Sequence, residues 1–385
     1  MVNVCYVVDA PFLGGAERYV ARLAAGLDRD RFRPSVVMRA PQSPASGMDE
    51  WKSQLEELGI PVRALPMNLP FSPHHAIPIL RAIADCAPHV VHVNLPGPHD
   101  GQMGLLVPLS RMAGATGVVV TEHLPMVDTP WKRGVLKRMS YRWVDRVVTV
   151  SKANVAFLIK KQSVRADRIL VVYNGLDVTY GARAGRFAHS DEARNAFRAS
   201  VGLPREAVVV VFVGNLLRHK GLHRVIRALS QLEDLPWHLL VVGEGPERGP
   251  CEKLLAAGGL SSRATFVGRT PEKFVERLLG SGDLLALPSD VEGMPLVIIE
   301  AMACGLPVVA TAVYGIPEAV VNGETGRLTR PGDGEGLRDA LADLIADAEE
   351  REWLGRNGRK RFEELFTLER QLRSMESLYL QVARS

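Results

Sequence analysis

The sequence predicts an α/β protein of two Rossmann-like, doubly wound domains, and three observations support this fold class. The 385 residues are too many for one ordinary hydrophobic core, so we expect two domains of similar size. Short β-branched apolar runs alternate with helical patterns in both halves of the chain. A polar stretch without apolar periodicity, residues 176–204, separates the halves and is interpreted as a linker.

The first domain is predicted to span residues 1–175. Its first strand is an apolar run typical of a buried parallel strand, and it leads into a loop that contains two glycines. Ligands of doubly wound sheets bind beyond the carboxyl ends of the strands, and this rule points to Gly14, Gly15, Asn94 and His123. The expected strands lie at 2–8, 35–39, 62–65, 89–93, 117–121, 146–150 and 169–172, and the expected helices at 16–27, 48–58, 73–86, 102–113, 131–143 and 152–161.

The second domain is predicted to span residues 205–366, where the same alternation restarts with a strongly β-branched strand. The final segment, 367–385, has apolar positions at helical spacing and little turn chemistry, so we predict a closing helix there. The expected strands of the second domain lie at 207–213, 238–242, 264–267, 284–288 and 308–311.

Composition and charge narrow the class of protein. A net charge of +4 and a pI near 8.9 suit acidic ligands such as nucleotide diphosphates or lipid phosphates, but this basic bias is too weak to indicate nucleic acid. No apolar run approaches the roughly 20 residues that span a bilayer, and the chain begins in a strand pattern without a signal peptide. We therefore expect a soluble, cytoplasmic protein that at most rests on a membrane. The four cysteines are isolated and are interpreted as reduced core residues: Cys5, Cys86, Cys251 and Cys304.

The stretch 289–305, SDVEGMPLVIIEAMACG, is the first candidate binding site. Pro295 suits a first helical turn and Gly305 followed by Pro307 ends a helix, so residues 295–304 are predicted to form one short helix. The helix is apolar on nearly every face, which is the pattern of a buried helix.

Two carboxylates accompany this short helix. Glu300 lies in its middle and must have a partner, because an unpaired buried charge is very unfavourable. Glu292 lies just ahead of the helix, where the amides and the helix dipole form a site for anions and hydroxyls. One alternative stays open for each acid: Glu300 pairs with an internal Arg or Lys, and Glu292 is a solvated loop residue.

An ordered set of short motifs resembles the retaining glycosyltransferases of family 4. The resemblance covers nearly the whole chain and implies the two-domain GT-B fold, with the C-terminal helix returning to the first domain. It also implies an enzyme of the hexosyltransferase type that takes a nucleotide-diphosphate sugar as donor. The motifs are GGAER at 14–18, VVTVSKAN at 147–154, YNGLD at 173–177, FVGNLLRHKG at 212–221, VVGEGP at 241–246, FVGR at 266–269, and the stretch that holds both acids.

The resemblance supplies a partner for each acid. In the family the first acid, here Glu292, lies near the transferred sugar, and the second, here Glu300, holds the ribose hydroxyls. A diol donates two hydrogen bonds to one carboxylate, and hydrogen bonds to a charged acceptor are the stronger kind. The helix start is expected to complete the donor site through its backbone amides. This segment comprises Gly293, Met294, Pro295 and Leu296, of which Pro295 has no N–H to donate.

The resemblance also aligns Lys220 with a phosphate-binding lysine. A diphosphate leaving group gains negative charge as the glycosidic bond breaks, so a cation there favours the transition state. The chain departs from the family at Asn215, where an arginine is most common. Arg218 is the candidate replacement, and a solvated loop side chain is the alternative for Arg218.

In the first domain the resemblance assigns the loop at Gly14 and Gly15 to the donor or the acceptor. Glycines let the backbone approach a ligand closely, and the following helix presents free amides. His123 aligns with a histidine that touches the transferred sugar, although Leu124 stands where an Asp often follows. The alternative is a histidine that is merely hydrogen-bonded within its loop. In the helix that follows the Gly14–Gly15 loop, Glu17 and Arg18 are interpreted as ordinary first-turn residues.

Two further loops are expected to border the nucleotide, at Gly243 and Arg269. Their contacts with the nucleotide are expected to come from backbone groups, so the sequence does not identify the nucleotide base. A UDP- or GDP-sugar is the favoured donor. We expect no obligatory metal or other cofactor, because Lys220 and the helix amides can balance the diphosphate. Asp290 and Glu292 only superficially resemble an acidic metal motif. The other histidines lack metal-ligand spacing.

Residues 131–143, WKRGVLKRMSYRW, combine basic and apolar positions. A basic amphipathic helix of this kind is expected to contact an anionic membrane at the inner face of the plasma membrane. The alternative is a solvated charged face on a helix that packs on the core. The basic residues are Lys132, Arg133, Lys137, Arg138 and Arg142.

The predicted function is retaining transfer of a sugar to a hydroxyl of a glycan or lipid-linked acceptor, in cell-surface polysaccharide or glycolipid synthesis. Two alternatives remain: a sugar-nucleotide epimerase on the same frame, and a non-catalytic sugar-nucleotide binder. A dinucleotide dehydrogenase fits poorly, because the pair Gly14–Gly15 lacks the G-x-G-x-x-G spacing.

Overall fold

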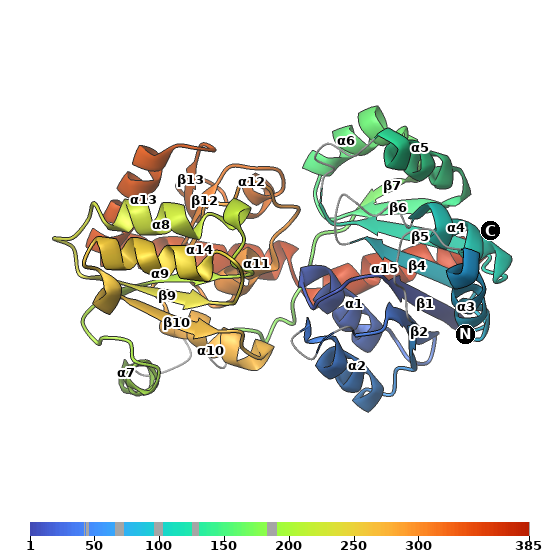
Figure 1. Ribbon diagram of the computed structural model, residues 1–385, viewed down its shortest axis with the longest axis horizontal. Helices are drawn as coiled ribbons and strands as arrows, with labels where there is room; N and C mark the ends of the chain where they lie inside the picture. Colours follow the sequence, from blue (N-terminus) through green and yellow to red (C-terminus); the bar gives the residue numbers. More distant parts are fainter. Residues whose placement is uncertain are drawn as a thin grey trace. The chain divides into compact units, whose positions relative to one another are not determined.

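Two parallel sheets organise the chain, one in each of two compact units (Figure 1). The computed structural model describes residues 1–41, 43, 46–65, 73–95, 103–124, 131–182 and 191–384. Unit 1 comprises Met1–Asn174 together with Leu368–Ser385, and unit 2 comprises Gly175–Thr367. Within the described residues the predicted fold class, two doubly wound α/β domains, is confirmed.

The sheet of unit 1 has the strand order β3-β2-β1-β4-β5-β6-β7, and all neighbours are parallel. The order reverses between β1 and β4, which makes their carboxyl ends the expected ligand edge. The strands are β1 Val2–Val8, β2 Phe32–Arg39, β3 Val62–Leu65, β4 Val90–Leu95, β5 Gly117–Glu122, β6 Arg146–Thr149 and β7 Ile169–Val171. The helices are α1 Gly15–Gly26, α2 Met48–Glu57, α3 Pro73–Ala84, α4 Met103–Met112, α5 Trp131–Ser140, α6 Ala153–Gln162 and α15 Leu368–Ala383.

The closing helix α15 completes unit 1, as the sequence predicted. Its apolar face joins the same core as β1 and α1, and Tyr379 is fully buried there. The Tyr379 hydroxyl donates to the hydroxyl of Tyr6 at 3.2 Å and is hydrogen-bonded to His92 Nδ1 at 2.7 Å. Figure 1 shows α15, in red, beside the blue and cyan strands of this sheet. Residues from the two ends of the chain therefore share one core.

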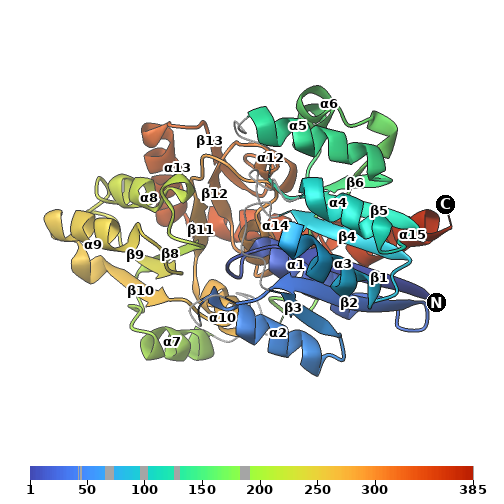
Figure 2. The same cartoon turned by 45° about the vertical axis from the view of Figure 1, so that its right-hand side comes forward.

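The sheet of unit 2 has the order β10-β9-β8-β11-β12-β13, and here the order reverses between β8 and β11. On its faces α8 packs against α13, and α11 against α14 (Figure 2). The strands are β8 Val208–Val213, β9 Trp237–Val242, β10 Ala264–Gly268, β11 Leu284–Leu287, β12 Val308–Thr311 and β13 Gly326–Thr329. The helices are α7 Asp191–Ser200, α8 Leu222–Leu229, α9 Arg248–Ala257, α10 Glu272–Ser281, α11 Leu296–Ala303, α12 Ile316–Ala319, α13 Gly334–Ala346 and α14 Ala348–Leu365.

The stretch interpreted as a linker contains the helix α7, which is attached by buried ion pairs and by an edge-to-face contact between Phe197 and Phe274. Arg194 and Arg198 are four residues apart on one helix face, and both donate to the carboxylate of Asp283, at 2.8 and 2.5 Å. Asp283 also accepts the amide of Val209 at 2.7 Å. Arg198 and Asp283 are 3% and 5% exposed, so this is a buried ion network at the start of β8.

We predict that Asp283→Ala lowers the free energy of unfolding of unit 2 by about 3–5 kcal/mol, because it leaves two arginines buried without their counterion. Chemical denaturation followed by tryptophan fluorescence measures this change. Glu206→Ala is the control, since the Glu206 side chain is 92% exposed and lies 3.8 Å from Arg205. Equal stability of the two variants would contradict the assigned role of Asp283.

Candidate active site

In unit 2 the loops after β8 and β11 bring two of the predicted residues into contact. Lys220 Nζ donates to Glu292 Oε1 at 2.6 Å, and Ser289 Oγ donates to the same oxygen at 2.9 Å. Glu292 is 4% exposed, whereas the Lys220 side chain is 24% exposed. The lysine therefore presents a cation at the surface of the carboxyl edge while its counterion is buried.

A glycine makes this contact possible. Gly221 follows Lys220 with φ of 81°, and a Cβ there would collide with the carbonyl oxygen of Pro288. The close approach of the two loops is secured by Arg224, which donates to the Pro288 carbonyl and to Asp290, both at 2.7 Å. Asp290, the first acid of the supposed metal motif, is thereby engaged in an ion pair.

Glu300 is buried, as its position in an apolar helix predicted. It is 2% exposed in the middle of α11, which begins seven residues after Ser289. Pro295 occupies the N-cap position, and no side chain caps the helix, so the positive end of the α11 dipole is not screened by a capping side chain. The Ile298 amide donates to the Pro295 carbonyl at 3.1 Å. The helix start, Glu292 and Lys220 thus share the edge at the β8–β11 switch point.

Arg218 does not join this group. Its side chain is 68% exposed and pairs with Glu247 at 3.3 Å, which matches the solvated alternative. Gly243 belongs to a close loop contact, since its φ is 134° and a Cβ there would collide with the carbonyl oxygen of Gly214. Arg269 is exposed just after β10.

In unit 1 the predicted glycine loop is hydrogen-bonded to Glu17, a buried acid. The sequence analysis interpreted this residue as an ordinary first-turn residue. The Gly14 amide donates to Glu17 Oε2 at 2.7 Å, and Glu17 is 2% exposed. The other carboxylate oxygen, Oε1, has no hydrogen-bond partner among the described residues. Burial raises the pKa of Glu17 to about 7. The signal was present as an acid at the third helical position, where a capping box places Glu.

His123 lies at the same edge and is fixed by a neighbouring strand. It is 8% exposed, and its Nε2 is 2.7 Å from Asn94 Oδ1. The Asn94 amide nitrogen donates to the carbonyl of Ala16 at 3.1 Å, which orients the amide oxygen toward the histidine. Nε2 therefore carries the proton and Nδ1 is the acceptor nitrogen. Burial lowers the pKa of His123 to about 3, so the ring is neutral at physiological pH.

The described residues also bear on metal binding and on membrane insertion. Among them, no three His, Cys, Asp or Glu side chains are grouped so that they could hold a metal ion. Within the same residues, no helix combines the length and the apolar character needed to cross a bilayer.

Comparison with known proteins identifies the family. The model described as glycosyl transferases group 1 matches residues 193–361, and the model of glycosyltransferase family 4 matches residues 13–180. The two matches cover most of both units, and the fold is that of solved GT-B proteins. The chain therefore belongs to the group 1, family 4 glycosyltransferases, as the ordered motifs indicated.

The curated relatives match part of their own length. The N-acetyl-alpha-D-glucosaminyl L-malate synthase of Bacillus anthracis is 32% identical over 184 residues, which are 48% of this chain and 48% of the relative. The D-inositol 3-phosphate glycosyltransferase of Corynebacterium efficiens is 31% identical over 274 residues, 67% of this chain and 63% of the relative. The chain thus spans about half to two thirds of the relatives that it matches.

Solved structures resemble the chain over its full length. Anabaena Alr3699/HepE in complex with UDP and glucose has a TM-score of 0.83 at 23% identity, and the match covers 98% of this chain and 99% of that one. WaaG, a glycosyltransferase involved in lipopolysaccharide biosynthesis, has a TM-score of 0.70 at 18% identity and covers 97% and 98%. At these identities the likeness shows a shared fold.

We predict that Glu17→Gln stabilises the protein above pH 7 by about 1–3 kcal/mol and has little effect near pH 5. The raised pKa means that the folded state binds the proton more tightly than the unfolded state, so the wild type loses stability as the pH rises from about 4.5 to 7. A glutamine keeps an acceptor for the Gly14 amide and carries no charge. Denaturation curves at both pH values measure the difference, and a pH-independent difference would exclude the buried carboxylate as its cause.

Proposed function

We propose that the chain is a retaining glycosyltransferase that moves a hexose-type sugar from a nucleotide-diphosphate sugar to a hydroxyl group of an acceptor. One observation carries the proposal: the partly exposed cation of Lys220 is paired with buried Glu292 at the open N-terminus of α11, with Glu300 buried in the same helix. Family membership supports the same reading. In this proposal residues 205–366 bind the donor, and residues 1–175 with 367–385 serve the acceptor side.

The proposed donor site assigns each charge a task. The diphosphate meets Lys220 and the first-turn amides of α11, where positive charge and the helix dipole favour it. The ribose diol donates to the Glu300 carboxylate, and Glu292 lies toward the sugar. As the bond from the anomeric carbon to the diphosphate oxygen breaks, that oxygen gains negative charge, which Lys220 stabilises.

Retention follows from a front-face reaction in this proposal. The acceptor oxygen bonds to the anomeric carbon on the face that the diphosphate leaves, and the departing phosphate oxygen takes the acceptor proton. No separate general base is then required. In unit 1, neutral His123 is suited to accept a hydrogen bond from a sugar hydroxyl at Nδ1, while Gly14 and Gly15 allow close backbone approach.

We propose a UDP-sugar as the first donor to test, with a GDP-sugar second. The support is that Anabaena Alr3699/HepE, which shares the fold, is solved with UDP and with UDP-glucose. For the acceptor we propose a glycan or lipid-linked hydroxyl in cell-surface polysaccharide or glycolipid synthesis, handled at the cytoplasmic face of an anionic membrane. The basic segment that contains α5 supports the membrane location.

Calorimetric titration with UDP, GDP, ADP and dTDP, without metal and then with magnesium, tests the donor assignment. We expect one nucleotide to bind without metal. Incubation of the matching nucleotide sugar without acceptor then separates the alternatives: an epimerase converts the donor to its isomer, whereas a transferase at most hydrolyses it slowly. Binding with neither transfer nor hydrolysis over a broad acceptor set would indicate a non-catalytic binder.

We predict that Glu300→Ala weakens nucleotide affinity by about 10- to 100-fold, because two hydrogen bonds to a charged acceptor are lost. The same calorimetric titration measures the change, and Glu300→Gln, which keeps one acceptor oxygen, should lose less. Glu364→Ala, at an exposed position of α14, is the control. Unchanged affinity in folded Glu300→Ala would remove the ribose assignment.

We predict that Lys220→Ala lowers kcat by about 100- to 1,000-fold with a smaller effect on nucleotide affinity, because the cation acts chiefly on the developing charge. Steady-state kinetics with the nucleotide-sugar donor and an acceptor that the wild-type enzyme glycosylates measure the change in kcat. Lys253→Ala, at an exposed position of α9, is the matched control. An effect confined to KM would contradict a role in leaving-group stabilisation.

A further inference from the structure

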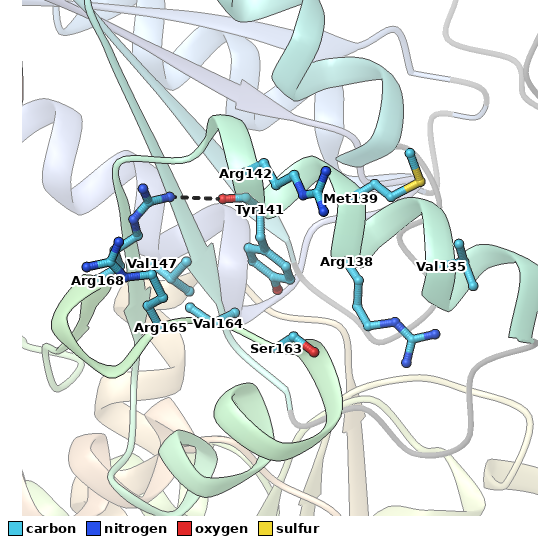
Figure 3. A pocket seen from close by; sticks show the side chains of 10 residues that line it. All are labelled: Val135, Arg138, Met139, Tyr141, Arg142, Val147, Ser163, Val164, Arg165 and Arg168. Carbon is cyan, nitrogen blue, oxygen red and sulfur yellow. Dashed lines mark hydrogen bonds between the residues drawn. The ribbon is translucent and has the colours of Figure 1, made fainter.

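A basic pocket lies in unit 1, at the edge of the sheet opposite to His123 and the glycine loop. It has a volume of about 500 Å³ and is formed by the end of α5, the 3₁₀ turn η2 (Tyr141–Trp143), and the segment that follows α6 (Figure 3). These segments lead into the first residues of β6 and β7, whereas His123 and the glycine loop follow the last residues of β5 and β1. The pocket therefore belongs to the amino-terminal edge of the sheet. Its lining residues are Val135, Arg138, Met139, Tyr141, Arg142, Val147, Ser163, Val164, Arg165 and Arg168.

The four arginines of this pocket are not equally engaged. Arg168 donates to the carbonyls of Tyr141 and Val144, at 3.4 and 3.1 Å, and thus has a structural role. Arg165 is paired with Asp167 at 2.6 Å.

Arg138 and Arg142 are exposed and, among the described residues, have no hydrogen-bond or ion-pair partner. Of the described residues that line the pocket, none carries a carboxylate. Two guanidinium groups are therefore available to an anion, and a guanidinium matches phosphate oxygens in a two-pronged geometry.

The segment that forms the pocket is much more basic than the rest of the chain. Residues 131–171 hold eleven Lys and Arg against two Asp, a net charge of +9, whereas the whole chain carries +4. Both of these aspartates are already paired, Asp145 with Arg111 and Asp167 with Arg165. The remainder of the chain is therefore net acidic, so an anionic surface is attracted to this segment in particular.

An apolar stripe runs beside the two available arginines. Leu136, Met139 and Trp143 are 44%, 55% and 54% exposed, and their spacing of three and four residues places them along one side of α5 and η2. Exposed apolar side chains next to basic ones, with a tryptophan among them, are the pattern of a membrane-interface segment. A free phosphate in water gains nothing from such a stripe.

The structure also corrects the predicted basic face of this helix. Lys137 is 2% exposed and pairs with Glu122 at 2.8 Å, and Tyr141 donates to the same carboxylate. Lys137 therefore anchors α5 to the end of β5 and does not face solvent. Because Lys137 points into the protein, the opposite side of α5 and of the following turn η2 faces solvent. That side carries Arg138, Arg142 and the apolar stripe.

We propose that this pocket binds the phosphate of an anionic lipid headgroup through Arg138 and Arg142, while Leu136, Met139 and Trp143 enter the bilayer interface. The inference rests on the membrane location proposed above and names its contact site. The site shares no residue with the proposed donor site, and it lies at the opposite edge of the unit 1 sheet from His123 and the glycine loop.

Vesicle sedimentation of the full chain tests this proposal, with phosphatidylglycerol–phosphatidylcholine vesicles compared with phosphatidylcholine alone. We expect binding to the anionic vesicles that weakens with salt. The double variant R138Q/R142Q should partition roughly 10- to 30-fold less, since each basic residue near an anionic surface contributes about a factor of five. W143A should bind several-fold less at every salt concentration, because its contribution is apolar.

The matched control is R33Q/R384Q, which removes the same charge from exposed arginines of unit 1 that have no partner among the described residues. This control should keep near-wild-type vesicle binding. An equal loss in the control, or no binding of the wild type to anionic vesicles, would overturn the proposal. Calorimetric binding of soluble glycerol phosphate without vesicle binding would overturn the lipid assignment and leave a small-molecule phosphate site.

UDP titration of the same proteins separates this inference from the proposed function. Both double variants should bind UDP as the wild type does, because neither touches the donor site. If R138Q/R142Q loses vesicle binding and still binds UDP, the result supports the lipid site and leaves the donor-site proposal untouched. Absent UDP binding with normal vesicle binding would instead bear on the transferase proposal.

Discussion

The burial of carboxylates beside helix starts is the constraint on which the candidate site of each unit depends. Parallel strands deliver their following loops to one edge, and each helix that begins there presents unpaired amides and the positive end of its dipole. Glu17 at α1 and Glu292 ahead of α11 exploit this environment, at 2% and 4% exposure. A carboxylate in such a place must be compensated, so it organises its neighbours: the Gly14 amide in one case, Lys220 and Ser289 in the other.

The ion pairs of unit 2 show how exposure separates structural from functional charge. Asp283 is surrounded by two arginines and a backbone amide, all partly or fully buried, so its hydrogen-bonding capacity serves the attachment of α7. The pair of Lys220 and Glu292 has the same chemistry, but its cation is open to solvent. A ligand anion can therefore contact the partly exposed ammonium group of Lys220 while the protein stays folded. Asp283, in contrast, is buried from solvent. This asymmetry, more than the residue types, marks the second pair as a candidate for catalysis.

The two edges of the unit 1 sheet carry different chemistry. At the carboxyl edge a neutral histidine and a glycine loop are held by short hydrogen bonds that they donate to the oxygens of Asn94 and Glu17. At the amino-terminal edge, Arg138 and Arg142, which have no carboxylate partner among the described residues, adjoin exposed apolar side chains. β5 is buried along its whole length and pairs in parallel with β6, which pairs with β7, so one sheet can hold the proposed membrane contact and the proposed sugar contact apart. This division allows the proposed membrane contact to leave the reacting edge accessible.

The sequence by itself determined the fold class, the helix around Glu300, and the strand-end positions of the candidate residues, because apolar periodicity and Pro/Gly punctuation are local signals. It also carried the motifs that identify the family. Only the tertiary structure decided which charges meet. Lys137 was expected on a basic surface but is buried against Glu122, and Glu17 was expected to be ordinary but is a buried acid under the glycine loop. α7 was missed because its attachment depends on Asp283, more than eighty residues away in the chain. Such partners are set by three-dimensional proximity, which no local pattern encodes.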